Sequence, residues 1–247
     1  MFLIFPTNKE KRGAIQPVTL LFIVICVVIY LIHFFGILFL PDKAKFEQYW
    51  IVFFGLIPKT HDVSGYITHI FAHEEFWHLF WNMIYLLFFG TIVEKRIGSV
   101  LFFYFFLVSG VVAALTFVLT MPVSASVSML GASGAISACE GAFLILVPKG
   151  KIHLRWFLLL LIHPYTGKIS VPKWTAWILV WIWFARDFYY AFLSLKGHYL
   201  TNVAFTAHVG GCIFGILFGC ACRLMEKAKP EMFQDSEVAE KENAESD

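Results

Sequence analysis

Charged residues are scarce in this chain: Asp, Glu, Lys and Arg make up only 15% of its 247 residues, and the formal net charge is +2. So small a charge offers no basic surface to a phosphate backbone, and we expect no nucleic-acid partner. The sequence also lacks a nucleotide-binding loop, a cofactor motif and an internal repeat. We therefore predict that the protein uses no cofactor.

Cysteine is present but shows neither pairing nor ligand spacing. The C-x-x-C spacing of a structural zinc site is absent, and all five cysteines fall within apolar segments: Cys26, Cys139, Cys212, Cys220 and Cys222. This pattern favours small apolar packing over a disulfide framework, and we expect no bound metal.

Apolar residues are abundant: 59% of the chain is hydrophobic and 18% is aromatic. Six segments approach the ~20 residues needed to cross a bilayer, which predicts an all-α, multi-pass membrane protein. These segments are residues 17–40, 76–93, 99–121, 129–147, 174–195 and 203–223. The first is too long for the core of a signal peptide and no small-residue cleavage site follows it, so we expect it to remain as an anchor.

The domain organisation follows from these spans. We predict a cytosolic N-terminal segment at residues 1–16 and one six-helix domain at 17–223. Residues 224–247 form an acidic tail whose low apolar content predicts disorder. A shorter apolar stretch, 156–162, has half the length of a span and is expected to be a membrane-apposed loop.

Lysine and arginine predict the orientation of the spans. They gather before the first span and after the second, fourth and sixth, whereas the 122–130 loop has no charge and the 41–75 loop has more acidic than basic residues. Both termini are therefore expected in the cytosol. The short chain and the lack of a transit peptide favour a bacterial inner membrane, with a eukaryotic organelle as the alternative.

Polar residues occur at the outer ends of three spans. His78 and Asn82 lie near the start of the second span, Ser133 at the start of the fourth and His208 at the start of the sixth. Counting helix rise from the inner end of a ~30 Å core puts Ser133 and His208 roughly 10 Å below the outer surface. Ionisable residues at such depth indicate a functional site.

These residue types suit nucleophilic attack on a carbonyl. A serine hydroxyl becomes nucleophilic when an adjacent base takes its proton, and histidine is the usual base, so Ser133 and His208 fit those roles. His78 and Asn82, at i and i+4 of one helix, can present two N–H groups to one developing oxyanion. The backbone N–H of Ser133, at a helix N-terminus, would be a third donor.

Small residues suggest how the two reacting groups meet. The face of Ser133 continues as Ser137 and Gly141, and that of His208 continues at similar spacing. Small residues at this spacing are typical of close helix packing in lipid. We expect packing roles for Gly131, Gly134, Gly211, Gly215 and Gly219.

Each signal alone has a common structural explanation. A G-x-S-G sequence can serve close helix packing, a membrane histidine can bond a backbone carbonyl, and a membrane asparagine can join two helices. A zinc-protease reading fails, because His73 and His78 are at i and i+5 and so point in different directions. His69 and His73 have i, i+4 spacing but lack the intervening glutamate motif.

Taken together, four motifs resemble the rhomboid family of intramembrane serine proteases. They are His73-x4-His78-x3-Asn82, Glu94-Lys95-Arg96-x-Gly98, Gly131-Ala132-Ser133-Gly134 and Ala207-His208-x-x-Gly211-x3-Gly215. The resemblance covers nearly the whole chain from the second span onward. It implies a six-helix bundle with a first outer loop, residues 41–75, lying partly in the membrane.

The resemblance implies an endopeptidase with Ser133 as nucleophile, His208 as base and His78 and Asn82 as oxyanion donors. Its substrates would be membrane proteins with a helix-destabilising segment near the outer membrane boundary. Two positions depart from the family pattern: Ser64-Gly65 replaces a loop Trp-Arg pair, and Ser137 replaces a tyrosine that stacks on the histidine. We therefore expect a less firmly anchored loop and a less rigidly held His208.

Asp187 is the only aspartate within a predicted span, which argues against an aspartyl protease. It could orient His208 as the third member of a triad. However, rhomboids work with a dyad, and the neighbouring Arg186, Tyr189 and Tyr190 are typical of an outer interface. We therefore expect Asp187 to have a structural role.

Two other functions are weighed. A catalytically silent relative that binds membrane segments is the main alternative, although the complete set of Ser133, His208, His78 and Asn82 counts against it. A transporter would need polar residues through the full membrane thickness. Here they stop about halfway.

Overall fold

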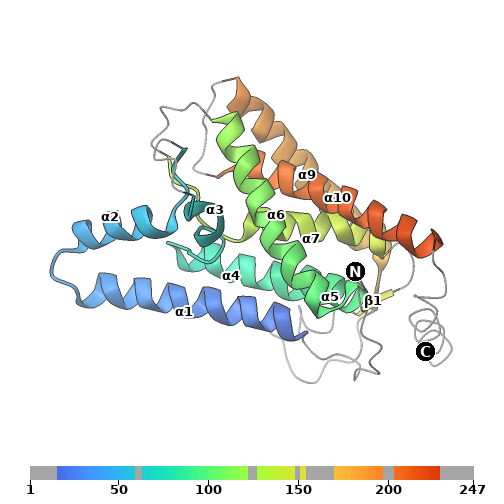
Figure 1. Ribbon diagram of the computed structural model, residues 1–247, viewed down its shortest axis with the longest axis horizontal. Helices are drawn as coiled ribbons and strands as arrows, with labels where there is room; N and C mark the ends of the chain where they lie inside the picture. The colour runs from blue at the N-terminus through green and yellow to red at the C-terminus, as the bar shows by residue number, and fades with distance from the viewer. Residues whose placement is uncertain are drawn as a thin grey trace.

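The computed structural model describes residues 16–58, 63–121, 127–147, 151–153, 170–196 and 203–228. Each of the six predicted spans contains a helix in these regions (Figure 1). The first, third, fourth, fifth and sixth spans correspond to α1 (Pro17–Phe39), α6 (Ser99–Thr120), α7 (Ser133–Leu146), α9 (Lys173–Leu195) and α10 (Phe205–Ala228). The all-α bundle predicted from the sequence is confirmed.

The second span is longer than predicted and contains a π-helical turn. It consists of α4 (Phe76–Tyr85), the π-helix η2 (Leu86–Gly90) and α5 (Thr91–Ile97). It ends at Gly98, whose φ of 83° lies in the left-handed region that glycine adopts at low cost. The chain therefore turns at once into α6, which explains the glycine of the Glu94-Lys95-Arg96-x-Gly98 motif.

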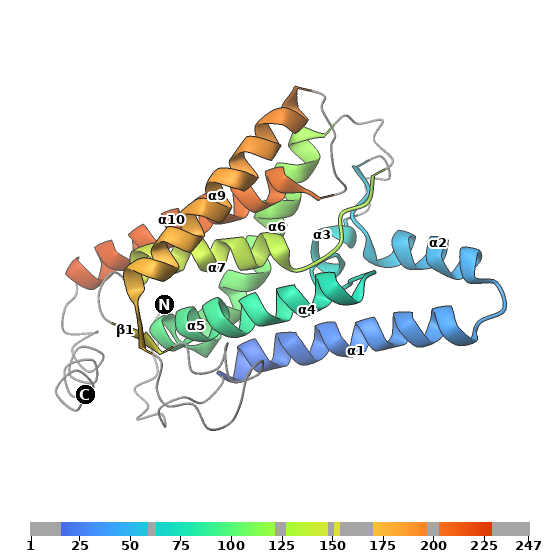
Figure 2. The same ribbon diagram turned by 180° about the vertical axis from the view of Figure 1, so that it is seen from behind.

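Helix α7 occupies the centre of the bundle, between α4 and α5 on one side and α6, α9 and α10 on the other (Figures 1 and 2). Its 14 residues rise only ~21 Å, less than the ~30 Å of a hydrocarbon core. The predicted start at residue 129 was too early, because α7 begins at Ser133. A residue at its N-terminus therefore lies below the membrane surface when its C-terminus is at the inner boundary.

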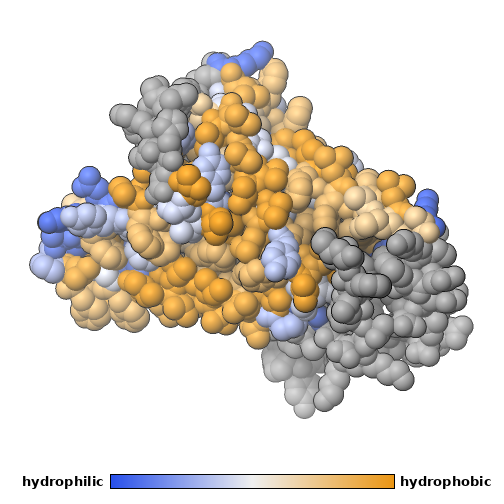
Figure 3. Space-filling model, in the orientation of Figure 1, coloured by the Kyte–Doolittle hydropathy of each residue, from blue (hydrophilic) through white to orange (hydrophobic). Residues whose placement is uncertain are grey.

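The outer surface is apolar, as an integral membrane protein requires. Figure 3 shows hydrophobic residues over most of the face in view. In the described residues, α1, the α4–α5 segment, α6 and α10 are each long and apolar enough to cross a membrane. In α1 only 17% of the most apolar window is buried, so most of that helix can face lipid.

The loop between the first two spans carries two helices, α2 (Lys43–Phe54) and α3 (Gly65–Thr68). Helix α2 runs back along α1 (Figure 1), where Nε2 of His33 lies 3.2 Å from a carboxylate oxygen of Glu47. An isolated bridge between Leu56 and Met129 then ties the loop to the segment that enters α7. The first loop is thus connected to the approach to Ser133.

The N-terminus of α1 is capped by a distant carboxylate. Both oxygens of the fully buried Glu94 accept hydrogen bonds. Oε1 accepts from the backbone N–H of Val18 at 3.0 Å and from the hydroxyl of Ser99. Oε2 accepts from the backbone N–H and the hydroxyl of Thr19, each at 2.7 Å. The first N–H groups of a helix have no partner within the helix, and the helix dipole favours an anion there. Glu94 therefore fixes α1 to the turn between α5 and α6.

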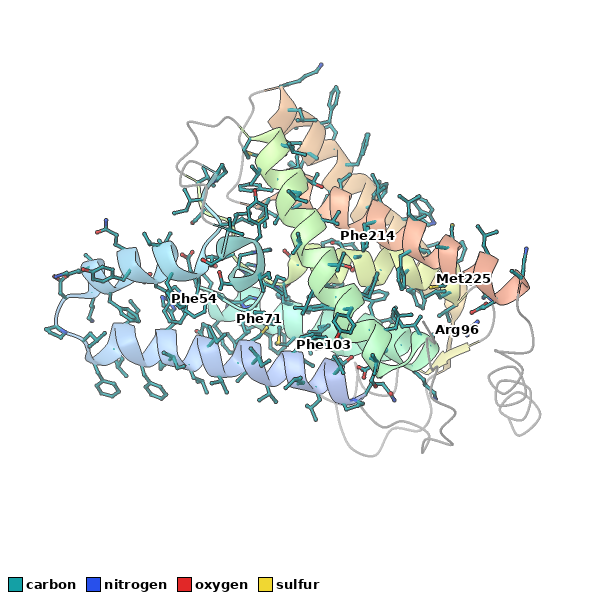
Figure 4. All side chains as sticks on the ribbon, viewed as in Figure 1. Phe54, Phe71, Arg96, Phe103, Phe214 and Met225 are labelled. Carbon is teal, nitrogen blue, oxygen red and sulfur yellow. The ribbon has the colours of Figure 1, made fainter. Side chains whose placement is uncertain are left out.

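Aromatic packing and ion pairs hold the remaining helices. The ring centroid of Phe22 on α1 lies 5.6 Å from that of Phe103 and 6.0 Å from that of Phe71. Figure 4 labels Phe103 and Phe71. At one end of the bundle, Arg96 lies near the end of α10 (Figure 4) and donates to Glu226 at 2.5 Å. These contacts tie α1 to α6 and to the segment before α4, and they tie α5 to α10.

Two short strands were not predicted. β1 (Lys151–His153) and β2 (Ser170–Pro172) pair antiparallel before α9. The membrane-apposed loop predicted at 156–162, the N-terminal segment before residue 16 and the tail beyond 228 lie outside the described residues. Helix α10 continues to Ala228, past the predicted boundary at 223.

Candidate active site

Ser133 and His208 are brought into direct contact. Ser133 is the first residue of α7 and His208 lies in the first turn of α10, and Oγ of the serine is 2.8 Å from Nε2 of the histidine. Both side chains are partly buried. The distance is within the 2.6–3.2 Å range expected for a nucleophile and its base.

Small residues make this approach possible. A side chain at Gly211 would collide with the carbonyl of Gly134, and one at Gly215 with the carbonyl of Ala138. The same holds in the other direction, because a side chain at Gly141 would strike the carbonyl of Cys212. Gly219 faces the side chain of Ile145. The predicted packing of α7 against α10 through small residues is therefore observed for this stripe of α10.

Gly131 and Gly134 lie in different environments, and only Gly134 is at a contact between helices. Gly131 precedes α7 and has a φ of +112°, a conformation that favours glycine, so it shapes the loop before the helix and does not pack one helix on another. Gly134 lies against the side chain of Ala113 on α6, with the carbonyl of Ala207 further away. The close packing of α7 therefore involves α6 as well as α10.

His78 and Asn82 converge beside Gly131. A Cβ placed on Gly131 would lie 2.8 Å from Nε2 of His78 and 3.3 Å from Nδ2 of Asn82, so both nitrogens lie close to one point. Gly131 is two residues before Ser133 in the chain. Two side-chain donors therefore gather next to the backbone that leads to the serine.

His73 orients Asn82, a role that the sequence motif did not reveal. Nδ2 of Asn82 donates to Nε2 of His73 at 2.8 Å, and the more distant N–H of Ala132 points to the same nitrogen at 3.5 Å. Burial and the nearby charge of His78 lower the pKa of His73 to about 3. His73 is therefore neutral and can accept at Nε2, which leaves the second N–H of Asn82 available.

Asp187 is the main correction to the sequence-based expectations. Asp187 as a whole residue is 7% exposed, and its Oδ2 lies 2.9 Å from Nδ1 of His208. Its other oxygen accepts from Nε and Nη2 of Arg186 at 2.9 and 2.6 Å. The sequence predicted a structural residue near the outer interface and no contact with His208, whereas α9 turns this face toward α10 and brings the two side chains together.

His208 has an aromatic neighbour other than the missing tyrosine at position 137. The ring of Phe205 meets the imidazole edge-on at 6.1 Å, and Tyr190 stacks on Phe205 at 4.8 Å. With Ser133 at one ring nitrogen and Asp187 at the other, both nitrogens are bonded. The supporting ring comes from the start of α10 instead of from position 137.

No group of three or more His, Cys, Asp or Glu residues suited to a metal ion occurs within the described ranges. The two histidines with i, i+4 spacing have other partners: Nδ1 of His69 is 2.8 Å from the carbonyl of Gly65, and Nε2 of His73 bonds Asn82. One ring nitrogen of each of these two histidines is therefore used in a hydrogen bond.

The described residues therefore define a helical membrane protein in which a serine at an internal helix N-terminus contacts a histidine of a second helix. The chain belongs to the rhomboid family, since the Rhomboid domain model matches residues 60–224.

Individual relatives agree with this assignment. The mitochondrial Rhomboid protein 1 of Saccharomyces cerevisiae is 31% identical over 191 residues, which cover 75% of this chain and 49% of the yeast protein. Rhomboid protease GlpG of Salmonella paratyphi A is 31% identical over 96 residues, which cover 38% of this chain and 32% of that protein. The chain thus matches about half or less of the length of these relatives.

Proposed function

We propose that this chain is an intramembrane serine endopeptidase that cleaves membrane proteins near the outer membrane boundary. The observation that carries the proposal is the 2.8 Å contact between Oγ of Ser133 and Nε2 of His208. Membership of the rhomboid family and the protease relatives support the same reaction.

In the first step, Nε2 of His208 takes the hydroxyl proton while Oγ of Ser133 forms a bond to the carbonyl carbon of the substrate. The tetrahedral intermediate then collapses. The C–N bond breaks, and His208 gives its proton to the departing nitrogen, which leaves an ester on Ser133. Water enters next and loses a proton to Nε2 of His208 while its oxygen bonds the ester carbon. When this second tetrahedral intermediate collapses, the bond from the carbon to Oγ breaks, His208 returns the proton to Oγ of Ser133, and the acid product leaves.

The oxyanion of each intermediate would be held by three donors. The backbone N–H of Ser133 is free of a helical partner because α7 begins there, and the helix dipole adds to its attraction for negative charge. His78 and Asn82 supply side-chain N–H groups that converge beside Gly131. Donors fixed before the reaction stabilise the charge without reorganising, and each is worth about 10²–10³ in rate.

The buried position of the pair limits the substrate. A helix keeps its peptide carbonyls hydrogen-bonded, so a transmembrane helix must unwind before Ser133 reaches one. We therefore propose substrates whose spans contain helix-destabilising residues near the outer boundary. The alternative is a catalytically silent relative that only binds membrane segments. The contact between Ser133 and His208 argues against it, because binding alone does not need a serine placed against a base.

The distribution of lysine and arginine supports cytosolic termini, with the reacting groups in the outer half of the membrane. A bacterial inner membrane remains our proposal for the location. The yeast relative is mitochondrial by name, so a membrane of that organelle is the competing location. Expression of the tagged chain in a bacterial host and in a yeast host, followed by membrane fractionation, would distinguish these two locations.

A serine-directed fluorophosphonate tests the proposed nucleophile directly. The purified protein is expected to be labelled once, at Ser133, and peptide mapping would identify the site. Ser133→Ala should remain unlabelled, while Ser109→Ala, which alters a serine bonded within its own helix, should be labelled normally. Equal labelling of Ser133→Ala would contradict the proposal.

A further inference from the structure

The carboxylate of Asp187 divides its two oxygens between two partners. Oδ2 lies 2.9 Å from Nδ1 of His208, and Oδ1 receives both Nε and Nη2 of Arg186. We propose that Asp187 is a positioning residue that holds His208 in the tautomer and orientation needed to activate Ser133, with Arg186 fixing the carboxylate. This inference rests on the proposed function, and it extends the pair to a chain of four side chains on α9, α10 and α7.

The simpler explanation is that Asp187 only neutralises Arg186. Burial argues against it, because the side chain of Asp187 is 10% exposed whereas that of Arg186 is 42% exposed. The guanidinium also has a second partner, the ring of Trp183, whose centroid lies 4.0 Å from it. Arg186 thus covers the carboxylate from the outside, and the buried oxygen faces His208.

A carboxylate at Nδ1 determines which ring nitrogen carries the proton. An ionised carboxylate can only accept, so the proton of neutral His208 must be on Nδ1 and the lone pair on Nε2. That lone pair faces Oγ of Ser133 at 2.8 Å, as a general base requires. With Ser133 alone as a partner, the opposite tautomer, in which Nε2 donates to the serine oxygen, would be equally compatible with the distance.

The carboxylate also acts when His208 becomes charged. As the imidazole takes the serine proton it becomes positive, and a negative group 2.9 Å away stabilises that state more than the neutral one. Only interactions that strengthen toward the transition state raise kcat. Phe205 supports the ring by its edge but has no charge or acceptor, so it cannot replace Asp187 in either task.

The experiment compares Asp187→Asn with a double variant, Arg186→Gln/Asp187→Asn, both in proteoliposomes with a single-span substrate. The single change leaves Arg186 without its carboxylate and can lower stability, whereas the double change removes both charges together. Tyr189→Phe is the matched control, because it alters a neighbouring exposed ring. Readouts are kcat, KM, the rate of fluorophosphonate labelling and the melting temperature.

We expect both variants to lose kcat by roughly 10²- to 10⁴-fold with KM nearly unchanged, and labelling of Ser133 to slow by a similar factor. The double variant should melt near the wild-type temperature and still show the loss. If it instead cleaves and labels within about threefold of wild type, the positioning role is refuted, whatever the single variant does.

Ser133→Ala separates this inference from the proposed function. If Ser133→Ala is inactive while the double variant is fully active, Asp187 is structural and the protease assignment stands. If Ser133→Ala retains wild-type cleavage, the proposed function itself fails, and the positioning role fails with it.

Discussion

Gly215 offers a sensitive test of the contact between α7 and α10. It lies about two turns below His208, or ~10 Å along α10, and therefore touches none of the proposed reacting groups. A Cβ at this position would lie 2.7 Å from the carbonyl carbon and 2.8 Å from Cα of Ala138, where ordinary contact needs about 3.5–4.0 Å. The obstacle is backbone, so it cannot rotate away, and the helices must separate by about 1 Å.

The consequence for activity can be worked from this shift. Adding 1 Å to the 2.8 Å between Ser133 and His208 takes the pair beyond hydrogen-bond length. A displacement of that size costs about 10²-fold in rate, and overpacking costs about 1–3 kcal/mol in stability. We expect Gly215→Ala to lose roughly 10²-fold in kcat, and Gly215→Leu to lose most remaining activity.

The assay is cleavage of a single-span substrate in proteoliposomes, with fluorophosphonate labelling as a measure that needs no substrate docking. Leu217→Ala is the control on the same helix, because Leu217 is 63% exposed and lies on another face. It should be tolerated. If Gly215→Leu cleaves at the wild-type rate, the described helix contact is wrong even if the Ser133–His208 pair is right.

Three further outcomes are expected. Asn82→Ala should lower kcat about 10²–10³-fold with KM little changed, and an unchanged kcat would remove Asn82 from the oxyanion site. Glu94→Gln should lower the free energy of unfolding in detergent by about 1.5–3 kcal/mol, because one of the two accepting oxygens is replaced by a donor. The change would be seen as a lower melting temperature, and an equal melting temperature would show that the α1 cap contributes little. Cysteines introduced into loop 122–130 should label from outside and those beyond residue 230 only after the inner side is opened, and the reverse pattern would invert the topology.

Local patterns predicted much of the fold and the central pair. Span length and hydropathy located the helices to within a few residues, and the small residues of α10 predicted its close contact with α7. Ser133 and His208 were paired because a serine nucleophile needs a base to take its proton. In the structure Oγ of Ser133 lies 2.8 Å from Nε2 of His208. These features depend on residues within one helix or on one helix face.

The missed features depend on how helices are rotated against one another. An aspartate next to an arginine and two tyrosines on α9 has the same sequence pattern whether it faces lipid or the bundle, and only packing turns Asp187 toward His208. Gly131 was grouped with the packing glycines because its sequence does not reveal its positive φ, which is set by the loop before α7. A usable signal for Asp187 was its charge within an apolar span, since such a charge needs a partner.

The most direct test of the account is the cleavage rate of the purified protein in proteoliposomes for Ser133→Ala, His208→Ala and the double variant. Nucleophile and base act as a unit, so each single change should remove at least about 10³-fold in kcat and the double change should be no worse than either. Melting temperatures should stay near wild type, because both side chains are only partly buried. Cleavage by Ser133→Ala at the wild-type rate would contradict the assignment of this pair as the active site.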